Sequence, residues 1–307
     1  MTYILRTNHL TKTFQGKEVV SHVNMNINKG EIYGFLGPNG AGKTTIMKMI
    51  TNLVKATSGE IELFGEKLTD TSYHLLSRMG TVIEYPIFYD KLTARENLEL
   101  HCEYMGYHHK KAIEEALELV NLKNIENKSV KNFSLGMKQR LGIARAITTK
   151  PELLILDEPN NGLDPIGIKE MRDLFKMLVK EYGITLLVSS HQLAEIELMA
   201  DTVGVLDHGK LIKEVSMKEI ADQHTEYIEL VTDDLKKAVY VLDHDMNLSN
   251  IKIVDDRILR IYDAEIHQSA ITKTLVLHDV TIETISKKIG SLENYFFTLL
   301  NGGGIHA

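Results

Sequence analysis

The stretch GPNGAGKT, residues 37–44, lies between a short apolar segment, 31–36, and a helical pattern that begins near Thr44. Its glycines let successive backbone N–H groups turn inward around an anion without Cβ clashes. The N-terminus of the following helix adds partial positive charge, and Lys43 adds a full charge toward the β- and γ-phosphates. The Thr44 hydroxyl is suited to ligate Mg²⁺, so the stretch predicts a site for a nucleoside triphosphate with Mg²⁺. We expect the contacts to come from Gly37, Pro38, Asn39, Gly40, Ala41, Gly42, Lys43, Thr44 and Thr45.

A second motif, LLILDEP at residues 153–159, is an apolar strand pattern that ends in two adjacent carboxylates. A buried strand places Asp157 at its C-terminal end beside the phosphate loop, where the carboxylate can hold the magnesium shell. Glu158 follows directly and can accept a proton from an attacking water. A GTPase would need an Asn-Lys-x-Asp element to read its base, and NKSV at residues 127–130 lacks the final Asp. A GTPase is therefore disfavoured.

Around these motifs, short apolar strands alternate with helical segments, which is typical of an α/β fold with a buried parallel sheet. The chain has 307 residues, of which 43% are hydrophobic and 25% charged, so it can form a packed core and is not disordered. After residue 217 the pattern becomes strand-helix-strand-strand-helix-strand with a closing helix at 291–300, which fits a small ferredoxin-like α+β unit. We therefore expect one domain at 1–217 and an accessory domain at 218–307.

Charge and hydropathy narrow the class of protein. The formal net charge is −7, from 35 Lys and Arg against 42 Asp and Glu, which gives no reason to expect a nucleic-acid partner. The single cysteine, Cys102, cannot form an internal disulfide, so nothing requires an oxidising compartment. No stretch approaches the roughly 18–20 apolar residues of a spanning helix, and the N-terminus lacks the apolar core of a signal peptide. These features predict a soluble cytoplasmic protein.

The segment FSLGMKQR, residues 133–140, resembles the signature of the ATP-binding subunits of ABC transporters, Leu-Ser-Gly-Gly-Gln. The resemblance covers roughly residues 2–215 and includes the motifs of the family in order. Phe133 replaces the Leu, Leu135 replaces the first Gly, and Gln139 comes later than the Gln of the family because Met137 intervenes. Ser134 is a good N-cap residue, and its hydroxyl with the following N–H groups makes an anion site at a helix start.

The resemblance implies a P-loop NTPase fold of the ABC ATPase type. It would have a RecA-like core, an antiparallel β subdomain and a helical subdomain over about residues 85–147. It also implies a homodimer in which two copies pack head to tail, so that each ATP lies between one phosphate loop and the partner's signature. On the matching positions, Ser134, Gly136 and Gln139 would then contact the nucleotide of the other copy.

Three further positions match the family. NNGLD, residues 160–164, resembles the D-loop, which includes Asp164 and crosses to the other site. His191 resembles the switch histidine that contacts the γ-phosphate. Phe14 stands where the family stacks an aromatic ring on adenine, although an ordinary strand-edge Phe would look the same.

The pattern of the family changes at Glu84, where a Gln is expected to touch both Mg²⁺ and the attacking water. A carboxylate is still a competent magnesium ligand, but it adds negative charge near the γ-phosphate. The alternative is a solvated loop carboxylate. The change resembles exporters that protect bacteria against peptide antibiotics such as bacitracin and lantibiotics, and SLENYF at residues 291–296 is similar to the same group.

An apolar-aromatic patch, Tyr85–Tyr89, follows Glu84. In the family this region receives a helix of the membrane subunit, so the resemblance implies integral membrane permease subunits that dock near Tyr85–Tyr89. The chain would then sit in the cytoplasm, on the inner face of the cell membrane. Packing of the patch under the helical subdomain is the alternative.

These observations predict a subunit that hydrolyses ATP to power a membrane ABC transporter, with a peptide antibiotic as the predicted substrate. A different class remains open, namely a soluble or sensor-associated ABC ATPase that uses ATP-driven dimerisation for regulation. The single set of motifs and the lack of a long heptad run argue against tandem and coiled-coil members of that class.

Overall fold

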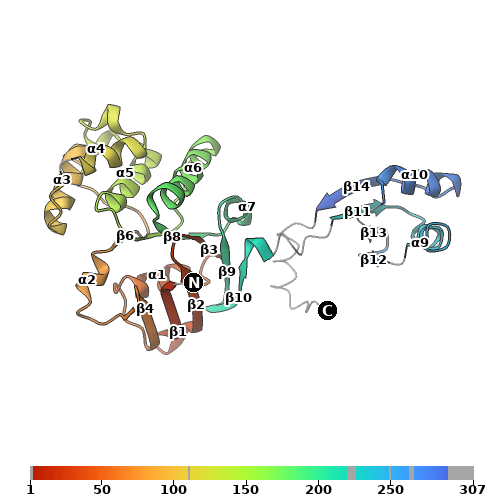
Figure 1. Ribbon diagram of the computed structural model, residues 1–307, viewed down its shortest axis with the longest axis horizontal. Helices are drawn as coiled ribbons and strands as arrows, with labels where there is room; N and C mark the ends of the chain where they lie inside the picture. Colours follow the sequence, from red (N-terminus) through yellow and green to blue (C-terminus); the bar gives the residue numbers. More distant parts are fainter. Residues whose placement is uncertain (1–2, 110, 220–225, 249, 263–265, 290–307) are drawn as a thin grey trace. The chain divides into compact units, whose positions relative to one another are not determined.

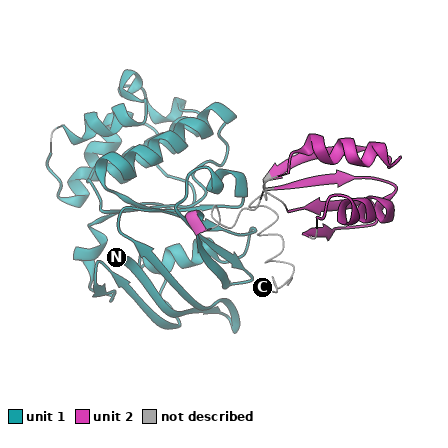
Figure 2. Cartoon of the chain, turned by 45° about the vertical axis from the view of Figure 1, so that its right-hand side comes forward, with its two compact units in different colours: residues 1–217 teal, residues 218–307 magenta. Residues whose placement is uncertain are grey.

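The computed structural model describes residues 3–109, 111–219, 226–248, 250–262 and 266–289. The chain divides into two compact units, Met1–Met217 and Lys218–Ala307 (Figure 2). Each unit has its own cluster of buried apolar side chains. Within the described ranges, no helix is both long and apolar enough to cross a membrane.

The first unit is built on a six-stranded sheet in the order β10-β9-β3-β8-β7-β6 (Figure 1). Its neighbours pair in parallel except β9 and β10, which are antiparallel. β3, β7 and β8 are buried along their whole length, which explains their largely apolar sequences. Because parallel strands end at one edge of a sheet, the segments after β3, β6, β7 and β8 lie at the same edge. The strands are β3 (Ile32–Leu36), β6 (Met79–Val82), β7 (Leu153–Leu156), β8 (Thr185–Ser190), β9 (Thr202–Asp207) and β10 (Lys210–Ser216).

A second, antiparallel sheet has the order β2-β1-β4-β5. It comprises β1 (Tyr3–Phe14), β2 (Lys17–Asn28), β4 (Ser58–Leu63) and β5 (Glu66–Lys67). β1 and β2 meet in a hairpin whose turn residues, Gln15 and Gly16, both have positive φ, 47° and 80°. Helix α1 (Lys43–Ile50) shares one buried core with both sheets, so the helix that follows the phosphate loop is fixed from two sides.

The helices α3, α4 and α5 group on the side of the parallel sheet away from the antiparallel sheet (Figure 1). α3 begins with a capping box between Thr93 and Glu96 and ends at Gly106, which has φ of 63°. The apolar spacing is helical over 93–119, and the structure divides this range into two helices, because Gly106 in the left-handed conformation ends the first. The helices of this unit are α2 (Tyr73–Leu76), α3 (Ala94–Met105), α4 (Ala112–Leu119), α5 (Leu135–Ile147), α6 (Pro165–Tyr182) and α7 (Leu193–Glu197).

The second unit has a four-stranded sheet in the order β12-β13-β11-β14, with every neighbouring pair antiparallel. This order, with one helix after β11 and another after β13, is that of the ferredoxin-like α+β fold. Apolar side chains of α9 and α10 pack on those of the sheet. The helix expected at 291–300 and the segment SLENYF lie outside the described residues. The elements are β11 (Glu226–Val231), α9 (Leu235–His244), β12 (Ile251–Ile253), β13 (Ile258–Ile261), α10 (Gln268–Leu277) and β14 (Thr284–Ile289).

Candidate active site

The loop between β3 and α1 has a shape that depends on glycine. A Cβ at Gly37 would lie 2.2 Å from Leu206 O, so no side chain fits there. Gly42 is the N-cap of α1 and has φ of 105°, a conformation that favours glycine. Among the described residues no side chain caps α1, so the first-turn N–H groups, which lack partners within the helix, are available to an anion. A Cβ at Gly40 would meet no described atom within 4 Å, so the loop faces open space.

Lys43 places a buried cation over this loop. Its side chain is 5% exposed, and Nζ donates hydrogen bonds to Gly37 O at 2.6 Å and to Pro38 O at 3.2 Å. The same Nζ lies 3.3 Å from Glu158 Oε1. The ammonium group is therefore held in place where a phosphate on the loop would need a counter-charge.

The ends of β7 and β8 bring a second set of oxygens to the loop. Thr44 Oγ1 donates to Asp157 Oδ2 at 2.7 Å, and Ser189 Oγ donates to Asp157 Oδ1 at 2.7 Å. Asp157 is 6% exposed. A hydroxyl and a carboxylate oxygen in contact are the kind of donors that Mg²⁺ prefers, and they come from the two residues that the sequence singles out for it.

Glu158 lies between the lysine and the predicted switch histidine. Its Oε2 is 2.9 Å from His191 Nδ1, while Oε1, which is buried, has only the electrostatic contact with Lys43 among the described residues. The backbone of Glu158 has φ of 48°, a left-handed conformation that is uncommon outside glycine and concentrates at functional sites. Its N–H donates to Ser189 Oγ at 2.8 Å, so a neighbouring strand helps to hold this conformation.

The signature segment packs against the predicted D-loop of the same chain. Ser134 is the N-cap of α5, and its Oγ accepts a hydrogen bond from the N–H three residues later at 3.3 Å. A Cβ at Gly136 would lie 3.0 Å from Leu163 Cδ2, and a Cβ at Gly162 would lie 2.3 Å from Leu135 Cδ2. Leu135, which departs from the glycine of the family, thus covers Gly162 and ties the two segments together.

Two other residues predicted to contact nucleotide have local roles in the single chain. Asp164 caps α6, where Oδ1 accepts from Gly167 N at 2.9 Å, and Gln139 is 3% exposed within α5. No hydrogen bond of the described residues joins Ser134, Asp164 or Gln139 to the phosphate loop of their own chain. The structure therefore gathers Lys43, Thr44, Asp157, Glu158 and His191 in one site and keeps the signature apart from it.

Glu84 lies two residues beyond β6, next to the end of β7. Asp157 N donates to Val82 O at 2.8 Å, so these two strand ends are neighbours. The Glu84 side chain is 61% exposed and has an ion pair of 2.6 Å with Lys48 of α1, and its φ is 60°. The carboxylate is thus held toward the helix that follows the phosphate loop.

Phe14 is the last residue of β1 and is 45% exposed. Lys12 Nζ lies 4.8 Å from the centroid of its ring, which places a cation over the ring. An exposed aromatic ring at this position is available for stacking, and the contact with adenine stays a prediction.

Comparison with known proteins identifies the family. The profile of the ABC transporter family matches residues 20–161. The uncharacterized ABC transporter ATP-binding protein YcbN of Bacillus subtilis (strain 168) is 65% identical over 307 residues, which is 100% of both chains. The bacitracin transport ATP-binding protein BcrA of Bacillus licheniformis is 46% identical over 305 residues, or 99% of this chain and 100% of BcrA. The chain belongs to the ATP-binding proteins of ABC transporters.

A solved structure agrees with this membership. The ATP-binding cassette MJ0796, in a dimeric post-hydrolysis state bound to ADP and Pi, matches with a TM-score of 0.64 at 28% identity. The match covers 69% of this chain and 98% of MJ0796. The predicted P-loop NTPase fold of the ABC type is therefore confirmed, as are ATP binding and ATPase activity as properties of the family.

Two members of the site are missed by the sequence motifs. Ser189 supports both Asp157 and the N–H of Glu158. Glu195 of α7 binds Asn160 and Ser190 through one carboxylate oxygen. A polar residue at the end of an otherwise apolar strand could have indicated Ser189, whereas nothing in the sequence places Glu195 against the segment 158–164.

Proposed function

We propose that this ABC ATPase powers a membrane transporter that exports, or confers resistance to, a peptide antibiotic such as bacitracin or a lantibiotic. The observation that carries the proposal is the similarity to BcrA, which extends over 99% of this chain and so includes the second unit. A module that only senses ATP would not need a carboxylate between the phosphate-loop lysine and a histidine. The Lys43–Glu158–His191 contacts therefore favour ATP hydrolysis over ATP sensing alone.

The triphosphate would bind at the N-terminus of α1, with Lys43 against its β- and γ-phosphates. Thr44 and Asp157, whose oxygens already meet, would hold Mg²⁺, with Glu84 as a further ligand from the neighbouring strand end. These residues fit the metal because hard oxygen donors converge beside an uncapped helix start. Bound Mg²⁺ would neutralise charge that develops on the transferred phosphoryl group.

Glu158 would accept the proton of the attacking water, as its position one residue beyond Asp157 suggests. His191, hydrogen-bonded to Glu158 Oε2, would fix the carboxylate and reach the γ-phosphate. Lys43 would exchange its carbonyl partners on the loop for phosphate oxygens, which keeps the cation in place as the bond to the leaving group breaks.

A second copy of the chain would complete each site. In this dimer Ser134 and Gly136 of one copy contact the nucleotide of the other, and the Asp164 segment crosses the interface. The packing of Leu135 on Gly162 supports this arrangement, because the signature and the D-loop segment would approach the partner as one surface. Gln139 is buried within α5, so it would affect nucleotide binding by holding the signature segment in position.

The permease is proposed to dock at Tyr85–Tyr89, from the cytoplasmic face of the membrane. Tyr85, Ile87 and Tyr89 are 66%, 83% and 57% exposed. Arg145 of α5 holds this segment, since Nη1 donates to Ile87 O at 2.9 Å and the guanidinium lies 4.9 Å from the centroid of the Phe88 ring.

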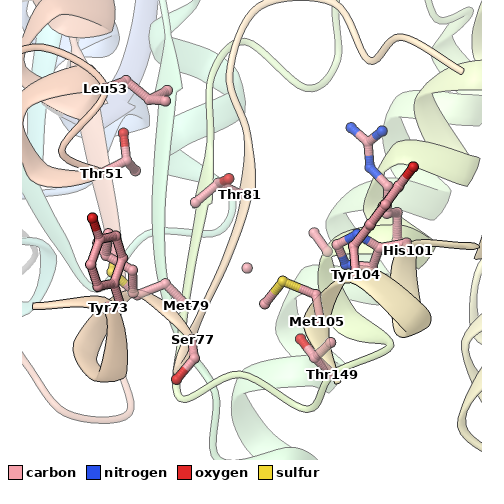
Figure 3. A pocket seen from close by; sticks show the side chains of 14 residues that line it. Thr51, Leu53, Tyr73, Ser77, Met79, Thr81, His101, Tyr104, Met105 and Thr149 are labelled. Carbon is pink, nitrogen blue, oxygen red and sulfur yellow. The ribbon is translucent and has the colours of Figure 1, made fainter. Parts of the chain in front are cut away.

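A cavity of about 500 Å³ includes Arg145, which holds the docking segment, in its lining. Apolar and aromatic side chains of β6, α2 and α3 face it, among them Met79, Tyr73, Tyr104 and Met105 (Figure 3). Burial and the nearby Arg145 lower the pKa of His101 in the same lining, which favours the neutral imidazole. A hollow with an aromatic rim suits the tip of an apolar helix.

The substrate is tested by deletion of the gene, followed by growth on bacitracin and on lantibiotics. We expect sensitivity to at least one of these peptides, restored by the wild-type gene and not by the Glu158→Gln form. Unchanged sensitivity across the panel would contradict the peptide-antibiotic assignment. Docking is tested with Ile87→Asp, which should abolish co-purification with the membrane fraction while ATP hydrolysis by the isolated chain is retained.

A further inference from the structure

Next to Glu158 and His191, two buried donors from different segments meet at one carboxylate oxygen. Glu195 Oε2 accepts hydrogen bonds from Asn160 Nδ2 at 2.9 Å and from Ser190 Oγ at 3.3 Å. Asn160 follows Glu158 by two residues, and Ser190 directly precedes His191. The two donor residues are 9% and 3% exposed. One side chain of α7 therefore links the segment that carries Glu158 to the segment that carries His191.

The Ser190 hydroxyl has a single hydrogen to give, and it is directed to Glu195. The Oγ atom accepts from Gln192 N at 3.0 Å, so one lone pair is used at the start of α7 and the hydrogen is used by the carboxylate. This arrangement fixes the backbone on either side of His191. On the other segment, the hydrogen bond from Asn160 limits movement just after the strained backbone of Glu158.

The geometry indicates what the site requires of residue 195. Both donors converge on Oε2, while Glu195 Oε1 and Asn160 Oδ1 are buried without a hydrogen-bond partner among the described residues. A single acceptor oxygen at the position of Oε2 is therefore enough to make both hydrogen bonds. A glutamine could place its carbonyl oxygen at the position of Oε2 and so accept both hydrogen bonds.

We propose that Glu195 is a positioning residue for ATP hydrolysis, which sets the spacing of Glu158 and His191 through Asn160 and Ser190. Its role depends on oxygen acceptance and not on negative charge. The proposal rests on the proposed function of Glu158 as the base. Small displacements of such groups slow the chemical step strongly, by up to about a hundredfold for a shift of about 1 Å.

The test is steady-state ATP hydrolysis by the full-length chain and by its Glu195→Ala, Glu195→Gln and Asn160→Ala variants. We expect Glu195→Ala to lower kcat about tenfold or more with KM for ATP within about twofold, because the loop that binds phosphate is untouched. Glu195→Gln should stay within about threefold of the wild-type kcat. Glu197→Ala, an exposed change in the same helix, is the matched control and should behave as the wild type.

The hydrogen bond between Glu195 and Asn160 leads to a second prediction, which compares the single variants with the double variant. Glu195→Ala combined with Asn160→Ala should lower kcat no further than the more affected single variant, because both remove the same hydrogen bond. Additive losses, or a Glu195→Gln variant as slow as Glu195→Ala, would overturn the proposal. A wild-type chain that does not hydrolyse ATP would instead refute the proposed function. If Glu195→Ala does not fold, the Glu195→Gln and Asn160→Ala rates decide.

Discussion

Glu84 and Lys48 form an ion pair whose two halves can be removed one at a time. Both side chains are partly exposed, 61% for Glu84 and 29% for Lys48, so the pair contributes about 0.2–1 kcal/mol to the free energy of unfolding. For a unit of about 200 residues, loss of 1 kcal/mol lowers Tm by roughly 2–4 °C. Glu84→Gln and Lys48→Gln should therefore lower Tm by similar, small amounts.

Glu84→Gln and Lys48→Gln should change kcat in opposite directions. For scale, a unit charge placed about 10 Å from a phosphoryl group would change its energy by about 1.7 kcal/mol at an effective dielectric constant of about 20. Solvent around these exposed side chains reduces this, so we expect changes in kcat of roughly three- to tenfold. Glu84→Gln removes negative charge and leaves Lys48 unpaired, which should raise kcat. Lys48→Gln leaves Glu84 unpaired and should lower it.

The assay is steady-state hydrolysis with saturating ATP and Mg²⁺, with thermal melts of the same preparations. A double variant, Glu84→Gln with Lys48→Gln, should return kcat close to the wild-type value. Equal slowing of both single variants would show that the intact ion pair matters and not the charge, and would rule out the proposed electrostatic effect. Unchanged kcat in both would support a solvated loop carboxylate at Glu84.

Two further predictions concern the framework of the site. Gly37→Ala should lower the free energy of unfolding by roughly 1–3 kcal/mol and abolish ATP binding, because its Cβ would meet Leu206 O at 2.2 Å. Thermal melts and fluorescent-nucleotide titration measure the two effects. Burial raises the pKa of Glu214, which accepts from Tyr33 OH and Asn26 N through one oxygen. A raised folded-state pKa means that the stabilisation is complete below the ordinary pKa of about 4.5 and is lost as pH rises through the folded value. Glu214→Gln keeps the acceptor oxygen, so its Tm relative to that of the wild type should rise as pH increases from about 4.5 through the folded pKa of Glu214 and then level off. Parallel curves would contradict the assignment.

The phosphate loop could be predicted from sequence because its chemistry is local. Three glycines, a lysine and a helix start fall within eight residues, and the structure places Lys43 and Thr44 where the motif requires them. Asp157 and Glu158 could be predicted in the same way, because a buried apolar strand rarely ends in two adjacent carboxylates unless a cation or a reaction requires them. Parallel strand order then brings these segments to one edge of the sheet.

Contacts between distant segments could not be predicted in this way. Glu195 meets Asn160 across 35 positions, and no short pattern encodes that approach. The packing of Leu135 on Gly162 is of the same kind, because it depends on how α5 and the segment before α6 meet. The helix break at Gly106 was visible in the sequence as a glycine, but apolar periodicity on both sides concealed it.

The role of Glu158 as the base is tested most directly by the ATPase rate of Glu158→Gln, measured with nucleotide binding in the same sample. We predict a kcat about 10²–10⁴-fold below that of the wild type, because the base is lost while Lys43 and the phosphate loop remain. ATP binding should persist, and Glu197→Gln should hydrolyse ATP as the wild type does. Hydrolysis by Glu158→Gln within a few-fold of the wild-type rate would contradict the role of Glu158 and with it the proposed mechanism.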